Sequence, residues 1–165
     1  MTAPESAASR AFMLAPGEGR TPAPLNIVGE STMVKVSAGD PAGALALFHL
    51  TAPRFTGPPL HVHTREDELF YVLDGTLVFE IGGLRSTVHA GGVVYLPRGV
   101  PHRYQNFEER DATLLIAVTP GESFEAFFTE LAAATPPAGG VPPLDILRAI
   151  DSRYGLETLG PPMFE

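Results

Sequence analysis

Short apolar runs follow one another between residues 25 and 118, and glycine, proline, aspartate and asparagine occupy the breaks between them. Runs of this length, bounded by turn residues, are typical of β-strands, and closely spaced strands are typical of a sandwich or a barrel. The pattern predicts strands over residues 26–36, 44–52, 60–63, 68–73, 76–81, 84–89, 93–96, 102–106 and 112–119. We therefore expect an all-β domain.

Two of the breaks carry strong turn signals. Asp74-Gly75 stands between two apolar runs, and this dipeptide predicts a two-residue hairpin because such a turn needs positive φ. Gly82-Gly83 predicts a second turn of the same kind.

The period of the apolar pattern changes after residue 119. Phe124, Phe127, Phe128 and Leu131 follow helical spacing, and Pro136-Pro137 ends this helix. A second short helix is expected over residues 144–154, with Gly155 placed to terminate it. Both apolar stripes indicate helices that pack on the outside of the barrel.

Three regions follow from these patterns. Residues 1–24 are rich in alanine, proline, serine and glycine and indicate a flexible N-terminal arm, with a strand added to a neighbouring subunit as the alternative. Residues 25–119 form the expected barrel, and residues 120–165 form a helical extension.

Composition excludes several classes of function. The net charge of −8 gives no basic surface for nucleic acid, and the absence of cysteine excludes disulfides and thiolate ligands. The start of the chain has no secretory pattern, and no apolar run of roughly 18 residues exists to span a membrane. We expect a soluble, cytoplasmic protein that uses nitrogen and oxygen ligands for any metal ion.

The chemistry-bearing residues form two motifs. The first contains His61, His63 and Glu68: the two histidines share one face of a strand, and the polar link over residues 64–67 allows Glu68 to open the next strand facing inward. In the second motif, Pro97 and Gly99 shape a turn before His102.

Closure of the strands into one barrel would bring these four side chains together in its lumen. Neutral imidazoles and a carboxylate suit one divalent transition ion, and Fe, Ni, Mn, Co, Zn and Cu all remain open.

The two motifs together closely resemble those of the cupin superfamily over residues 43–119, although Gly57 lies nearer to His61 than the usual spacing. The resemblance implies a jelly-roll β-barrel with His61, His63, Glu68 and His102 as the metal ligands.

Neighbouring residues permit other interpretations. Glu66 also has suitable spacing for a ligand, but Glu68 directly precedes the apolar run 69–73, so we interpret Glu66 as a solvated turn residue. His49 and His89 are expected in the core. By the period of two, a further set shares the faces of Glu68 and His102 and is expected to line a substrate pocket: Phe70, Val72, Tyr104 and Asn106.

Four protein ligands leave open positions on a five- or six-coordinate ion, which can then polarise an oxyanion while Glu68 acts as the catalytic base. Residues 119–128 resemble the segment after the barrel in single-domain bacterial cupins similar to quercetin 2,3-dioxygenase. This similarity suggests a dioxygenase that uses dioxygen to cleave a small flavonol-like or dicarbonyl substrate. Non-oxidative isomerase, decarboxylase or polyketide-cyclase-like activity is the alternative, and a ligand-binding protein without catalysis is the third.

The expected strand over residues 68–73 is apolar on both faces. Leu69, Tyr71 and Leu73 then point away from the lumen, and a strand of this kind needs cover on its outer side. Either the helix that begins near Phe124 or a second subunit provides this cover, and we predict a homodimer.

Overall fold

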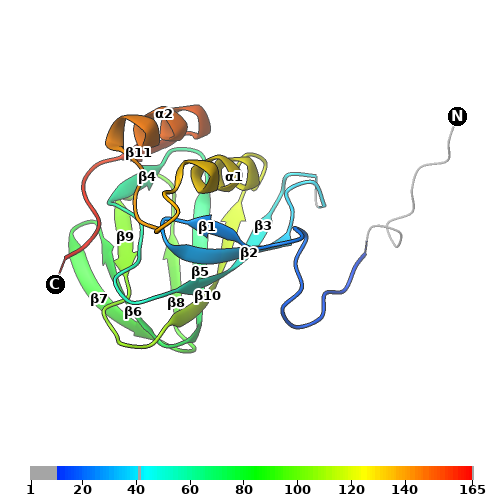
Figure 1. The fold of residues 1–165 in the computed structure, drawn as a ribbon, viewed down its shortest axis with the longest axis horizontal. Helices are drawn as coiled ribbons and strands as arrows, with labels where there is room; N and C mark the ends of the chain where they lie inside the picture. The colour runs from blue at the N-terminus through cyan, green and yellow to red at the C-terminus, as the bar shows by residue number, and fades with distance from the viewer. Residues whose placement is uncertain (1–10, 41, 165) are drawn as a thin grey trace, which may run out of the picture.

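The computed structural model describes residues 11–40 and 42–164, so the first ten residues of the predicted N-terminal arm lie outside the described residues. The described chain forms strands followed by two helices and a last short strand (Figure 1). These elements are β1 Leu25–Ile27, β2 Glu30–Val36, β3 Ala46–Ala52, β4 His61–His63, β5 Asp67–Asp74, β6 Thr76–Ile81, β7 Leu84–His89, β8 Val93–Leu96, β9 His102–Gln105, β10 Ala112–Thr119, α1 Phe124–Ala134, α2 Leu144–Tyr154 and β11 Leu156–Thr158.

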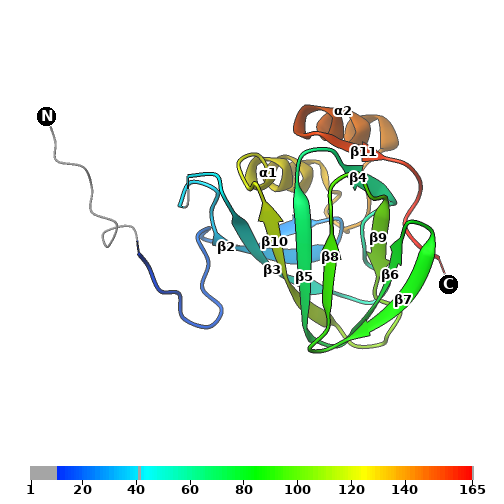
Figure 2. The same cartoon turned by 180° about the vertical axis from the view of Figure 1, so that it is seen from behind.

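Two antiparallel sheets face each other and enclose the core. One sheet has the order β1-β2-β3-β10-β5-β8, and the other has the order β11-β4-β9-β6-β7. The two views show the sheets curling around a common interior, with the helices gathered at one end (Figures 1 and 2). The predicted all-β barrel of jelly-roll type is confirmed.

Strict alternation along the central strands separates the interior from the surface. In β5, Glu68, Phe70 and Val72 are buried, whereas Leu69 and Tyr71 are exposed. Successive side chains of a strand point to opposite faces, so the polar Glu68 enters the lumen beside apolar residues. The same alternation in β10, which pairs with β5, extends this wall of the core.

The prediction of a hairpin at Asp74-Gly75 is wrong. Gly75 does adopt positive φ (+83°), but β5 pairs with β10 and β8, whereas β6 pairs with β9 and β7. The turn therefore carries the chain from one sheet to the other. The second turn is a true hairpin, because Ile81 pairs with Leu84 across Gly82-Gly83.

The expected strand over residues 26–36 is interrupted. Val28 and Gly29 both adopt positive φ, at 49° and 97°, and Ile27 pairs with Glu30 across them. Positive φ at both central residues is the condition for a tight two-residue hairpin. This turn converts one predicted strand into the pair β1–β2 and places Glu30 at the start of β2.

The two helices form as the apolar spacing predicts. The buried residues of α1 are Phe124, Phe127, Phe128 and Leu131, and α2 ends at Gly155 in the left-handed conformation (φ 80°). Helix α1 packs against β1 and α2, and α2 packs against β11, so the helices close one end of the barrel (Figure 2).

Within the described ranges, neither helix has the length and apolar character of a bilayer-spanning segment.

Candidate metal centre

Four side chains from three strands meet at the end of the barrel that the helices close. His61 and His63 come from β4, Glu68 from β5 and His102 from β9, and one potential ligand atom from each lies within 4.8 Å of those from the others. An ion with bonds of about 2.1 Å separates ligands on opposite sides by about 4.2 Å. The cluster is therefore compatible with one ion after a small contraction.

Strand pairing positions these side chains. His61 of β4 pairs directly with His102 of β9, and the short link after His63 leads the chain into β5 in the other sheet. The turn before β9 is fixed to β4 because the Gly99 amide donates to the His63 carbonyl at 2.7 Å. Residues far apart in the sequence thus enter one lumen from facing sheets.

Backbone carbonyls fix the ring orientation of two histidines. His61 Nδ1 lies 2.8 Å from the Pro59 carbonyl, and His102 Nδ1 lies 2.9 Å from the Val100 carbonyl. A carbonyl oxygen only accepts, so each Nδ1 carries the proton and each neutral ring keeps a lone pair on Nε2. Such outer partners commonly orient metal-binding histidines.

Within the cluster, one carboxylate oxygen of Glu68 lies close to the Nε2 atoms of two histidines. His102 Nε2 lies 3.0 Å from Glu68 Oε2, and His63 Nε2 lies 3.4 Å from the same oxygen. A carboxylate oxygen and an imidazole lone pair are both acceptors, so a proton or a metal ion must lie between them. Both ring nitrogens of His63 are buried without a hydrogen-bond partner, and Nε2, the one that faces Glu68, is the nitrogen that can bind a metal ion.

Electrostatics keep Glu68 ionised and His61 neutral. Burial raises the pKa of Glu68, but the charge of His63 and the hydrogen bond with His102 outweigh burial and lower the pKa to about 2. Burial and repulsion from His102 and His63 lower the pKa of His61 well below its ordinary value. An ionised carboxylate and a neutral imidazole are the states in which these groups bind a metal ion.

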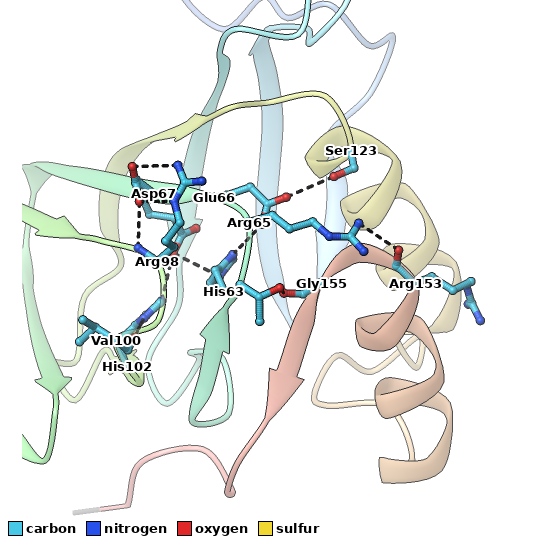
Figure 3. A network of polar contacts seen from close by, with 12 residues as sticks. His63, Arg65, Glu66, Asp67, Arg98, Val100, His102, Ser123, Arg153 and Gly155 are labelled. Atoms are coloured by element: carbon cyan, nitrogen blue, oxygen red, sulfur yellow. Dashed lines mark hydrogen bonds and ion pairs between the residues drawn. The ribbon is translucent and has the colours of Figure 1, made fainter.

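Glu66 is not the solvated turn residue that the sequence suggested. Its side chain is only 2% exposed, and Oε2 lies 3.7 Å from His63 Nδ1 (Figure 3). Glu68 approaches the other ring nitrogen, Nε2. The Ser123 hydroxyl donates to Glu66 Oε1 at 3.3 Å, at the start of α1. Of residues 64–66, Glu66 alone is buried, because its side chain turns inward between His63 and Ser123, where it can orient His63.

An ion pair between Asp67 and Arg98 joins the two segments that precede Glu68 and His102. The Arg98 amide and guanidinium both donate to the Asp67 carboxylate, at 2.9–3.1 Å (Figure 3). These hydrogen bonds lower the pKa of Asp67 to about 2. The pair joins the start of β5 to the turn that precedes His102.

The expectation that His49 and His89 lie in the core is wrong. His49 alternates with the buried Phe48 and Leu50 on β3 and is only partly buried on the outer face. His89 is exposed at the end of the edge strand β7, where its Nδ1 lies 3.1 Å from the Thr76 hydroxyl.

A small cavity of about 70 Å³ extends from the cluster into the barrel. Phe70 and Tyr104 line this cavity, as expected, but Val72 and Asn106 do not. Val72 lies further along β5 in the packed core. The Asn106 amide donates to the carbonyls of Ala52 and Arg110, so this side chain holds the loop after β9 instead.

The C-terminal helices complete the cavity wall. Phe124, Phe127 and Phe128 of α1 line it together with Leu147 of α2, and the Phe124 ring stacks against His63 with centroids 5.4 Å apart. These residues separate the cluster from solvent on one side. The helical extension is thus part of the site.

Two acidic cavity residues escaped the sequence analysis. Glu30 of β2 and Asp151 of α2 both line the cavity and are buried. Neither belongs to a motif with recognisable spacing, and only the fold brings them near the histidines. The hydroxyl of Thr158 donates to Asp151 Oδ2 at 2.6 Å, so Asp151 already has a partner.

Comparison with known proteins agrees with this geometry. The family model described as Cupin domain matches residues 48–124, which contain all four residues of the cluster. An uncharacterized protein of Streptomyces coelicolor is 34% identical over 58 residues, covering 35% of this chain and 54% of that protein. Germin-like protein 1-1 of Oryza sativa subsp. japonica is 35% identical over 104 residues, covering 58% of this chain and 45% of that protein. The chain spans about half the length of these curated relatives.

A solved structure extends the likeness to the fold. The crystal structure of a predicted oxalate decarboxylase from Thermotoga maritima superposes with a TM-score of 0.55 at 23% identity. The match covers 59% of this chain and 91% of that one. This likeness concerns the fold, and the family model and the fold together support the cupin superfamily for the barrel.

Proposed function

We propose that this chain, with its cupin barrel, is a metal-dependent enzyme that binds one divalent transition ion through His61, His63, Glu68 and His102. The single observation that carries the proposal is the convergence of imidazole lone pairs on Glu68 Oε2, at 3.0 and 3.4 Å, beside a cavity. Three neutral imidazoles, one carboxylate and a divalent ion sum to a local charge of +1. Such a centre favours an anionic oxygen ligand.

The cavity indicates the size and polarity of the substrate. Its volume of about 70 Å³ is well below the roughly 300–1,000 Å³ typical of sites for drug-sized ligands. A flavonol would fit only if α1 and α2 moved, whereas a small dicarbonyl compound would fit with a much smaller movement of these helices. We therefore favour the dicarbonyl substrate over the flavonol.

The ion would supply Lewis-acid chemistry that acidifies the carbon between two carbonyl groups and stabilises the resulting negative charge. Glu68 makes its contacts with His63 and His102 through Oε2, which leaves Oε1 as the oxygen that accepts the substrate proton. The aromatic residues of α1 exclude bulk water from this step. Oxidative cleavage of the activated substrate then consumes one dioxygen molecule, whose two atoms enter the products.

Dioxygen uptake tests this function. Protein loaded separately with Fe, Mn, Co or Ni is mixed with pentane-2,4-dione in an oxygen electrode, and the products are analysed by mass spectrometry. We expect uptake of one dioxygen per dione cleaved, and loss of uptake in Glu68→Ala. Turnover without dioxygen would instead assign a non-oxidative reaction, and tight binding without turnover would assign a binding protein.

A further inference from the structure

A second carboxyl group lies in the cavity that the metal cluster borders. Glu30, the first residue of β2, is 2% exposed and lines this cavity together with His61, His63 and Glu68. Most of the remaining lining is aliphatic or aromatic, and it includes no lysine or arginine among the described residues. Burial of an unpaired charge costs much free energy, so a carboxyl group in such surroundings must be either paired with a cation or protonated.

The hydrogen bonds of Glu30 indicate where its proton lies. The Tyr104 hydroxyl donates to Glu30 Oε2 at 2.7 Å. The Thr56 hydroxyl has one proton, and it lies 2.7 Å from the Pro53 carbonyl but 3.3 Å from Glu30 Oε1, so its donation to Oε1 is the weaker of the two. Because Oε2 accepts from Tyr104, Oε1 is the oxygen that carries the proton when Glu30 is neutral, and its long contact with Thr56 can be exchanged for a better acceptor.

Burial is consistent with a neutral Glu30. Removal from water raises its pKa from 4.5 to about 8, and the hydrogen bonds from Tyr104 and Thr56 offset this effect only in part. A protonated carboxyl group in an apolar cavity is a hydrogen-bond donor without charge. It favours a neutral acceptor such as a carbonyl oxygen.

We propose that Glu30 is a substrate-binding residue that donates a hydrogen bond from Oε1 to a carbonyl oxygen of a small dicarbonyl ligand, with Tyr104 as the residue that positions it. This inference rests on the proposed function, because the same ligand would bind the metal ion with one oxygen and Glu30 with the other. The ligand class is a small molecule with an ionisable oxygen and a neutral acceptor, joined by a short apolar frame.

The proposal predicts a characteristic pH dependence of binding. The titratable residues that share the cavity with Glu30 are Tyr104 of β9, His61 and His63 of β4, Glu68 of β5 and Asp151 of α2. As the pH rises through about 8, Glu30 loses its proton and the donor becomes an anion that repels the carbonyl oxygen. Affinity for the dione then falls.

The experiment measures binding of pentane-2,4-dione by calorimetry between pH 6 and 10, without dioxygen, to zinc-loaded and to metal-free protein. We expect Glu30→Leu to weaken binding about tenfold at neutral pH, the equivalent of one hydrogen bond. Glu30→Gln retains an N–H donor, so its affinity should stay within about threefold of the wild type without the alkaline loss. The ionisation of the dione itself is common to both proteins and cancels in the comparison.

Two further variants complete the design. Tyr104→Phe removes the hydrogen bond that favours the Glu30 anion, so the alkaline loss should move to higher pH. Glu157→Gln changes an exposed glutamate of β11 and should bind as the wild type does. Thermal unfolding and zinc content identify any variant that fails to fold or to hold the ion.

The outcomes separate this inference from the proposed function. If the wild type binds zinc and the dione but Glu30→Leu binds equally well, or Glu30→Gln keeps the alkaline loss, the inference fails and the metal site stands. If zinc does not bind but the Glu30 variants change dione affinity as expected, the metal site fails and the role of Glu30 stands. Absence of dione binding to both forms of the wild type contradicts both.

Discussion

At the scale of single residues, the buried carboxylate of Glu66 affects how tightly the cluster binds a metal ion. It lies beside Nδ1 of His63, whereas Glu68 approaches Nε2, and the Ser123 hydroxyl holds its other oxygen. Carboxylates in this position orient an imidazole and increase its basicity, and their loss typically weakens metal binding about 10–100-fold.

We therefore expect Glu66→Ala to weaken zinc affinity by about tenfold while the protein still binds one ion at saturation. Competition with a chromophoric chelator gives the affinity. Glu157→Ala, at an exposed position, serves as the control. A Glu66→Ala protein that binds no ion at saturation would make Glu66 a direct ligand and contradict its assigned position.

Glu30 predicts a pH dependence of stability as well as of binding. Its pKa is about 8 in the folded chain and about 4.5 when exposed, so the folded state holds a proton that the unfolded state has released. The stabilisation is complete below pH 4.5 and is lost as the pH rises toward 8.

The free energy of unfolding should therefore fall by a few kcal/mol over this range, since one pKa unit corresponds to about 1.4 kcal/mol. Urea titrations at a series of pH values measure the slope. Glu30→Gln, which has no proton to release, should show a shallower slope, and equal slopes would show that Glu30 is ionised in the folded state.

At the scale of elements, the spacing of apolar residues predicts helices and strands correctly where a segment is long enough to show a clear period. The helix with Phe124, Phe127, Phe128 and Leu131 on one face and the alternating strand β5 both form as their periods indicate. β11 has only three residues, and its pairing with β4 cannot be inferred from so short a segment.

The turn at Asp74-Gly75 shows why local chemistry does not specify sheet membership. Positive φ at Gly75 is a property of the dipeptide, whereas the partners of β5 and β6 depend on the whole barrel. The same reasoning applies to Glu30 and Tyr104, which lie 74 positions apart and meet only through the fold.

Gly75 and Gly82 allow a matched test of this turn. A Cβ atom at Gly75 would lie 2.8 Å from the Ala112 Cα, whereas a Cβ at Gly82 meets nothing within 4 Å. Both have positive φ, so Gly82→Ala should cost about 1 kcal/mol of stability and Gly75→Ala about 2 kcal/mol or more. Urea unfolding measures both, and an equal loss would contradict the close approach of the turn to β10.

At the scale of the whole molecule, the outer face of β5 and β8 has no cover within the described chain. Leu69, Tyr71, Leu73, Val93 and Tyr95 are 39–58% exposed and adjoin one another on the paired strands. Helix α1 lies at the end of the barrel, so it does not provide the cover that the sequence required. The homodimer therefore stays a prediction, with a second copy of this face as the partner.

Light scattering coupled to gel filtration tests this association at micromolar concentration. We expect the mass of a dimer for the wild type and of a monomer for Tyr71→Lys combined with Tyr95→Lys. Leu84→Lys on the edge strand β7 of the other sheet changes a still more exposed apolar residue and should leave the dimer intact. A wild-type monomer would contradict the assignment of this face.

The central claim is that four side chains, drawn from both sheets, hold one metal ion. The most direct measurement is the metal content of purified protein by elemental analysis, before and after reconstitution, for the wild type and Glu68→Ala. We predict one divalent transition ion per wild-type chain and a large loss in Glu68→Ala, which keeps the fold but lacks the carboxylate that faces His63 and His102. A wild-type chain that binds no ion after reconstitution, or a Glu68→Ala chain that binds it as tightly, would contradict the account.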